Sequence, residues 1–210
     1  MPYRLNIRTF LNFALYITLF TVMCLSQSYA AGNLVKTDED PETGLKSWLW
    51  DYDGFYLELT QRLPDQTRGY FESRGFDRSS TEIAGTSCIF QTMVKNSGTD
   101  SSSKIAADLN EWLVISGETS KPMLLREYWQ KLWQQRAQSE SAKIAFEWSL
   151  LPTRVEYEIN DYNWGMSSYG LPPGSHFDLK FSWYRNGEKF TGRINDVVCP
   201  DDIHPEPPAQ

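Results

Sequence analysis

Residues 177–198 read FDLKFSWYRNGEKFTGRINDVV, and this stretch predicts a β-hairpin. Apolar residues alternate with polar ones from Phe177 to Trp183, which is the period of a strand with one buried face. Asn186-Gly187 fits a two-residue type I′ turn, because both positions tolerate positive φ. Residues 190–198 then return as the partner strand, so the C-terminal third centres on an antiparallel sheet.

Further strands are predicted upstream of this hairpin. Trp48, Trp50 and Tyr52 alternate before a turn at Asp53-Gly54, and residues 55–59 form the return strand. The other three predicted strands span residues 88–96, 105–115 and 154–159. Because a polar loop, residues 97–103, separates the first two of these three, we expect them to pair as a long hairpin.

Four segments predict helices from their capping residues and apolar spacing. The first spans residues 65–74 and ends before Gly75, and the second begins near Ser80 with a capping box at Ser79 and Glu82. The third, capped by Ser120 with Pro122 in its first turn, runs to residue 138, and the fourth spans residues 142–151. Trp129 and Trp133 form an apolar stripe on the third helix, which we expect to cover the sheet.

These elements predict an α+β fold in which an antiparallel sheet packs against two or three amphipathic helices, with one disulfide. We expect a single domain over residues 45–199. Residues 31–44 are acidic and polar and predict a flexible lead-in. Residues 200–210 contain four prolines and predict a disordered tail.

Residues 1–30 have the organisation of a secretory signal peptide. Arg4 and Arg8 precede an uncharged apolar run, which ends in small residues suited to cleavage after Ala30. The alternative is an uncleaved membrane anchor, because the run approaches the length of a bilayer span. With cleavage, we predict a periplasmic or secreted protein without stable membrane insertion.

Cleavage would leave two cysteines, Cys88 and Cys199. In an oxidising compartment an even pair predicts one disulfide. The alternative role, as a thiol nucleophile or metal ligand, is disfavoured because there is no C-x-x-C motif and no nearby histidine.

The charge excludes one large class of partner. The formal net charge of −7 becomes −9 when residues 1–30 are removed, because they contain two arginines and no acid. Binding to nucleic acid requires basic side chains that neutralise its phosphates, and this acidic chain has no basic surface of that kind. The spacing of Gly165, Gly170 and Gly174 also does not match a phosphate-binding loop, and we predict no cofactor.

Three candidate chemistries each depend on a small number of residues. Hydrolysis by a Ser-His-Asp triad would need His176, because it is the one histidine outside the proline-rich tail. The sequence has no G-x-S-x-G motif to supply the serine nucleophile. His176 and Met166 are weak candidates for a soft copper site, and methionines that fill core gaps are the alternative. A carbohydrate-active protein, either a binding module or a hydrolase, is a third possibility. It would use three carboxylates and two tryptophans: Asp51, Asp53, Glu58, Trp48 and Trp50.

The aromatic residues favour a different function. The segment 160–176 is rich in glycine and proline and contains Tyr162, Trp164, Tyr169 and His176. Trp164 and Tyr169 have no periodicity there, whereas five other tryptophans lie on proposed apolar faces: Trp48, Trp129, Trp133, Trp148 and Trp183. A rigid loop with exposed aromatic side chains is a recognition surface. We therefore predict an exported, non-enzymatic binding or accessory protein that recognises an envelope partner protein or a small ligand through these four residues.

Overall fold

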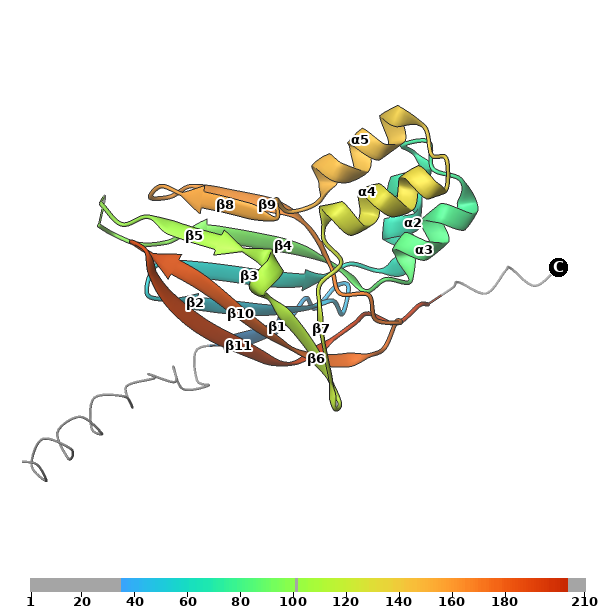
Figure 1. Ribbon diagram of the computed structural model, residues 1–210. Helices are drawn as coiled ribbons and strands as arrows, with labels where there is room; N and C mark the ends of the chain where they lie inside the picture. The colour runs from blue at the N-terminus through green and yellow to red at the C-terminus, as the bar shows by residue number, and fades with distance from the viewer. Residues whose placement is uncertain (1–34, 101, 204–210) are drawn as a thin grey trace, which may run out of the picture. The chain divides into compact units, whose positions relative to one another are not determined.

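The computed structural model describes residues 35–100 and 102–203, and these form two antiparallel sheets and four helices (Figure 1). The predicted α+β class is confirmed. The predicted single sheet is instead a pair of sheets, and the helices gather at one end of the strands. The predicted signal peptide, residues 1–30, lies outside the described residues.

The first sheet has five strands in the order β1-β2-β3-β4-β9. They are β1 (Val35–Glu39), β2 (Lys46–Tyr52), β3 (Phe55–Gln61), β4 (Ile89–Asn96) and β9 (Tyr162–Ser168). Asp53 and Gly54 have φ angles of 55° and 81° in the turn between β2 and β3, which confirms the predicted hairpin.

The second sheet has six strands, and β10 is its centre. The strands are β5 (Ile105–Asp108), β6 (Leu113–Ser116), β7 (Thr119–Pro122), β8 (Arg154–Tyr157), β10 (His176–Arg185) and β11 (Glu188–Val198). β11 pairs with one edge of β10, and β5 and β6 share the other edge. Asn186 and Gly187 have φ angles of 49° and 84°, as the type I′ turn requires.

Aromatic side chains fill the space between the two sheets. The ring of Trp50 on β2 meets Phe181 and Trp183 on β10, with centroids 5.2 and 6.0 Å apart. Phe55 stacks on Trp183 at 4.8 Å. The hydrophobic faces of the two sheets therefore bury each other.

The predicted hairpin between residues 88–96 and 105–115 is wrong. β4 pairs with β3 and β9 in the first sheet, whereas β5 pairs with β8 and β10 in the second. A 3₁₀ turn, η1 (Leu109–Glu111), also divides residues 105–115 into β5 and β6. Alternation shows that one face of a strand is buried, but it does not identify the neighbouring strand.

The helices are α2 (Pro64–Glu72), α3 (Arg78–Gly85), α4 (Arg126–Gln135) and α5 (Glu140–Ser149). The third predicted helix begins later than expected, because Thr119–Pro122 is the edge strand β7. The cap of α3 is Asp77, whose side chain accepts a hydrogen bond from the Ser80 amide, and not Ser79.

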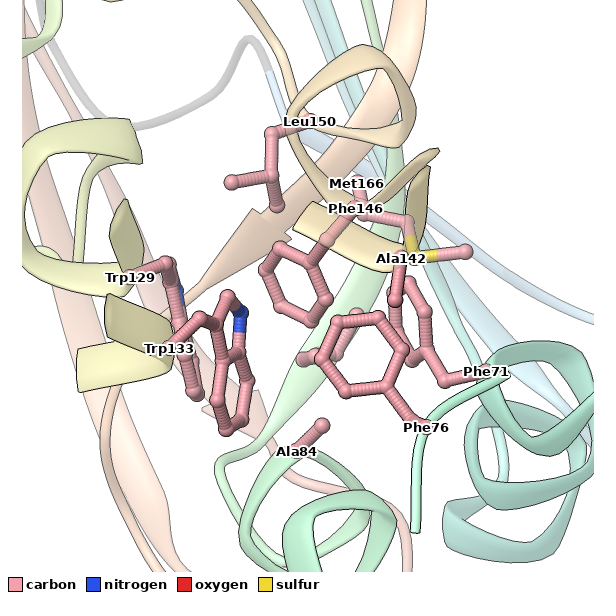
Figure 2. Packing of buried hydrophobic residues seen from close by; sticks show 10 residues of the cluster. Phe71, Phe76, Ala84, Trp129, Trp133, Ala142, Phe146, Leu150 and Met166 are labelled. Atoms are coloured by element: carbon pink, nitrogen blue, oxygen red, sulfur yellow. The ribbon is translucent and has the colours of Figure 1, made fainter. Parts of the chain in front are cut away.

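The four helices share a hydrophobic cluster of their own (Figure 2). Trp129 and Trp133 stack at 5.2 Å and pack around Phe146. Ile89 and Met166, from β4 and β9, join the cluster to the first sheet. The Trp129/Trp133 stripe therefore lies within the helical cluster and does not cover a sheet as predicted.

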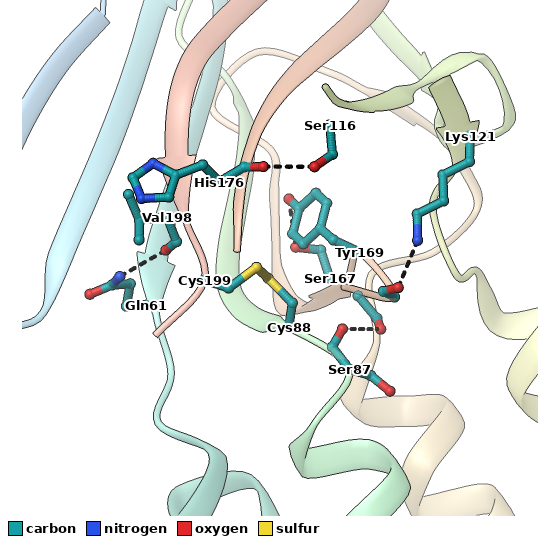
Figure 3. The surroundings of a disulfide bond; sticks show 12 residues. Gln61, Ser87, Cys88, Ser116, Lys121, Ser167, Tyr169, His176, Val198 and Cys199 are labelled. Atoms are coloured by element: carbon teal, nitrogen blue, oxygen red, sulfur yellow. Dashed lines mark hydrogen bonds between the residues drawn. A yellow bond between two sulfur atoms is a disulfide. The ribbon is translucent and has the colours of Figure 1, made fainter. Parts of the chain in front are cut away.

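The predicted disulfide is present between Cys88 and Cys199 (Figure 3). It joins the start of β4 to the end of β11, so it connects the two sheets. Beside it, the Gln61 side chain donates a hydrogen bond of 2.8 Å to the Val198 carbonyl and makes a second connection.

The ends of the domain differ from the predictions. Val35–Glu39 pairs with β2, so part of the predicted flexible lead-in is a strand with exposed side chains. In the predicted tail, Asp202 forms an ion pair with Arg68 at 2.6 Å. Residues 204–210 lie outside the described part. Across residues 35–100 and 102–203, no helix has the length and apolar character needed to cross a bilayer.

Candidate functional site

The segment predicted as an aromatic loop contains the strand β9. Met93 of β4 faces Trp164, and Lys95 faces Tyr162. The prediction failed here because burial in β9 does not follow polarity: the strand buries the polar Ser167 and Ser168 but exposes the apolar ring of Trp164.

Two of the predicted binding residues share the outer face of this strand. Trp164 is 65% exposed and Tyr162 is 61% exposed. They lie two residues apart on a strand, so their side chains project from the same face. The opposite face of the sheet carries Trp48, Leu57 and Val94 and is buried against the second sheet.

A third large aromatic residue, Trp148, lies at the end of α5 and is 83% exposed. The expectation that Trp148 lies on an apolar core face is wrong. A Cβ on Gly165 would lie 2.9 Å from the Leu151 amide nitrogen and 3.2 Å from the Ser149 carbonyl oxygen, so α5 ends directly against β9. This contact joins Gly165 of β9 to Ser149 at the end of α5, and the residues directly before these two are Trp164 and Trp148. We call Trp148, Tyr162 and Trp164 the aromatic surface.

Sequence reasoning missed Trp148, although α5 contains a signal for it. Ala142 and Phe146 form one apolar pair at four-residue spacing and are buried, whereas Ile144 and Trp148 form a second pair and are exposed. A surface helix needs one apolar stripe to reach its core. The second stripe on α5 is therefore surplus to folding.

The outer face of the first sheet continues from the aromatic surface in two rows of cross-strand neighbours. One row runs Leu49, Glu58, Met93, Trp164, and the other runs Asp51, Tyr56, Lys95, Tyr162. The Tyr56 hydroxyl donates to Glu58 Oε2 at 2.9 Å. Burial, together with this bond and the Glu58 charge, raises the pKa of Tyr56 to about 12. The face therefore combines aromatic rings with carboxylates.

Tyr169, also predicted as an exposed binding residue, is fully buried, with 0% exposure. Its hydroxyl accepts a hydrogen bond from Ser167, which is also hydrogen-bonded to Thr92. The Tyr169 backbone amide donates a hydrogen bond to the carbonyl of Cys88. Tyr169 is therefore a core residue beside the disulfide.

His176 is exposed but is not part of the aromatic surface. It begins β10 in the second sheet, and its Nδ1 lies 2.7 Å from Asp196 Oδ1 on β11. Met166, its proposed partner for copper, is buried in the helical cluster. Within the described residues, no group of three or more His, Cys, Asp or Glu side chains could hold a metal ion.

The carboxylates and tryptophans proposed for carbohydrate chemistry do not lie together in one site: some are buried in the core and others are on the surface. Trp48 and Trp50 are 3% and 1% exposed, so they cannot serve as sugar platforms. Asp53 forms an ion pair with Arg185 of the second sheet. Asp51 accepts a hydrogen bond of 2.8 Å from Ser97 and, with Glu58, lies on the outer face of the first sheet.

No protein-family model, no curated protein and no solved structure matches the chain. The aromatic surface and the outer face of the first sheet are therefore the basis for assigning a function.

Proposed function

We propose that this protein is an exported, non-enzymatic binding or accessory protein that recognises a partner through the aromatic surface. The observation that carries the proposal is the exposure of Trp148, Trp164 and Tyr162 at 83%, 65% and 61%. Tryptophan and tyrosine supply large contact areas and dominate the energetics of many interfaces. Exposed apolar groups gathered in one place mark interaction sites more often than isolated ones do.

The rigidity of the supporting elements strengthens this proposal. Trp164 and Tyr162 project from a strand paired with β4, and Trp148 from a helix that is anchored by Phe146. Side chains on such elements lose little backbone entropy on binding. The disulfide is compatible with an oxidising periplasmic or extracellular location.

Cross-linking and affinity capture from the envelope fraction tests the proposal. The captured partner should be lost with Trp164→Ala and with Trp148→Ala, while the melting temperature of each variant stays close to that of the wild type. Tyr128→Ala is the matched control, because Tyr128 is an aromatic residue on α4 that is 47% exposed and outside the aromatic surface. Equal capture by all four proteins would refute the proposal.

A carbohydrate ligand is the second candidate, and the outer-face rows favour it. Glu58 and Asp51 share this face with Trp164 and Tyr162, and aromatic rings with nearby carboxylates bind sugars. Glycan-array binding that is weakened by both Trp164→Ala and Glu58→Gln would support it. A silent array, with the protein folded and monodisperse, would remove this candidate.

A further inference from the structure

The outer edge of β9 is only partly occupied. At its C-terminal half, the Ser168 and Met166 carbonyls accept hydrogen bonds of 2.9 and 3.0 Å from the Leu124 and Leu151 amides. In a β-strand, alternate residues direct their backbone groups to the same side. The N–H and C=O groups of Trp164 and Tyr162 therefore also point away from β4, and no hydrogen bond within residues 35–100 and 102–203 occupies them.

The other edge strands carry features that discourage strand addition, and β9 does not. β1 reads VKTDE, β8 reads RVEY, β7 contains a lysine and a proline, and β11 contains four charged residues. Charges and proline on an edge are the usual protection against pairing with another chain. β9 reads YNWGMSS, without charge or proline.

The surroundings of this edge select the charge of a ligand. An open cleft of about 320 Å³ lies between β8 and the start of β9, lined by Val155, Tyr157, Asp161 and Tyr162 among others. Glu156 also lines it, and Glu158 is adjacent; one lysine, Lys104, pairs with both of these glutamates. Lys95, the cross-strand neighbour of Tyr162, is a second cation at this edge. The three acids exceed these two cations, so the surroundings of the cleft are negative. A second copy of this chain would bring these acids together, which disfavours pairing of β9 with itself.

We propose that an extended segment of a partner protein, with alternating cationic and apolar side chains, adds to β9 as a further strand. This inference rests on the proposed function and names the partner class for the aromatic surface. Apolar side chains of the added strand would contact Trp164 and Tyr162 on the outer face. Cationic side chains would project to the opposite face, toward Glu156 and Asp161 in the cleft.

The first test is amide hydrogen exchange in the free protein. The Tyr162 and Trp164 amides should exchange at least tenfold faster than those of Asn163 and Gly165, because only the latter pair faces β4. Uniform protection along residues 162–165 would show that the edge is already occupied and would overturn the proposal. If this uniform protection appears only at high protein concentration, together with dimerisation, the occupant of the edge is a second copy of the chain. That outcome would also overturn the proposal.

The second test uses a synthetic probe, acetyl-Lys-Val-Lys-Tyr-Lys-Val-Lys-amide. The probe should bind and slow exchange at Tyr162 and Trp164 at least tenfold. N-methylation of alternate amides gives two further peptides with the same side chains. One of the two, with methyl groups facing β9, should lose binding at least tenfold, and the other should retain it. A peptide with glutamate in place of each lysine should bind at least tenfold more weakly.

The outcomes separate this inference from the proposed function. Probe binding without protection of Tyr162 and Trp164, or with equal tolerance of both methylated peptides, would overturn strand addition and leave the aromatic surface as a binding site. Absence of probe binding at millimolar concentration would also overturn strand addition by a cationic segment. Failure of the proposed function is seen separately, as partner capture that survives Trp148→Ala and Trp164→Ala.

Discussion

Gly192 shows how closely the two sheets approach. A Cβ at this position would lie 2.5 Å from Cζ of Phe181 and 3.0 Å from Cζ2 of Trp50. These rings belong to opposite sheets and are fully buried, so neither has free space to move into. A side chain at Gly192 would force the sheets apart.

Gly192→Ala should therefore lower the free energy of unfolding by ~1–3 kcal/mol, the usual cost of overpacking a core. Urea denaturation measures this change. Gly69→Ala is the matched control: Gly69 lies in α2, and a Cβ there would have no atom from another part of the fold within 4 Å. The control should be neutral or stabilising by ~1 kcal/mol, because alanine favours helices. A neutral Gly192→Ala would contradict the tight contact between the sheets.

Glu111 is the centre of a polar network on the second sheet. Its carboxylate accepts hydrogen bonds from the Ser182 and Tyr184 hydroxyls and forms an ion pair with Lys189 at 2.9 Å. The bonds from Ser182, Lys189 and Tyr184 lower the pKa of Glu111 from 4.5 to about 2.

A pKa that is lower in the folded protein gives a pH-dependent stability. The contribution of Glu111 is present above pH 4.5 and is lost as pH falls toward about 2. Glu111→Gln should remove this component, so stability measured between these pH values falls less steeply than in the wild type. Glu118→Gln, which removes an exposed carboxylate in the turn before β7, is the matched control. An identical slope in Glu111→Gln and wild type would count against the network.

The four helices form a cluster that depends on Phe146. This ring stacks on Phe71 of α2 at 4.3 Å and contacts Trp129 and Trp133 of α4. The cluster meets the sheets through few residues, principally Ile89 and Met166. The helices can therefore lose their packing while the sheets persist.

Phe146→Ala should destabilise the protein by ~3–5 kcal/mol through loss of buried area and the cavity left behind. Amide exchange should accelerate mainly in α2 to α5, with β10 and β11 remaining protected. Ile144→Ala, on the exposed side of the same helix, should change stability by less than ~0.5 kcal/mol. Equal acceleration throughout the sheets would show that helices and sheets unfold as one unit.

The disulfide and an ion-pair network join segments that are distant in the chain. Cys88 and Cys199 are separated by 111 residues and join the start of β4 to the end of β11. Arg68 adds a further long-range connection, because it forms ion pairs with Glu82 of α3 and with Asp202 beyond β11. The segment after the last strand is therefore held against the helices.

Replacement of both cysteines by alanine should lower stability by up to ~4–5 kcal/mol, because the unfolded chain regains the entropy of a long loop. Chemical denaturation of the oxidised wild type and the double variant measures the difference. Reduced wild-type protein is the control and should resemble the variant. An unchanged denaturation midpoint would show that the interface between the sheets, and not the disulfide, holds the two ends together.

Several features were predictable because they depend on residues that are close in the chain. The Asn186-Gly187 turn follows from two residues that accept positive φ, and α2 follows from its apolar spacing and the glycine that ends it. The pairing of Cys88 with Cys199 followed from there being two cysteines outside the predicted signal peptide.

The aromatic surface was predictable in part. Trp164 fits no periodic pattern, which favours exposure, and both Trp164 and Tyr162 are exposed. Tyr169 also fits no periodic pattern but is buried, because β9 leads it into the core beside Cys88. A residue without periodicity has no sequence signal for its exposure, and contacts distant in the chain settle it.

Local chemistry in this chain determines turns, helix ends and which face of a strand is apolar, since each depends on neighbouring residues. The division of the strands between two sheets, the burial of Tyr169 and the exposure of Trp148 arise only when distant segments pack together. The reason is that burying a hydrophobic face is favourable whichever apolar surface covers it. Only the complete set of contacts in the folded chain selects the surface that does so.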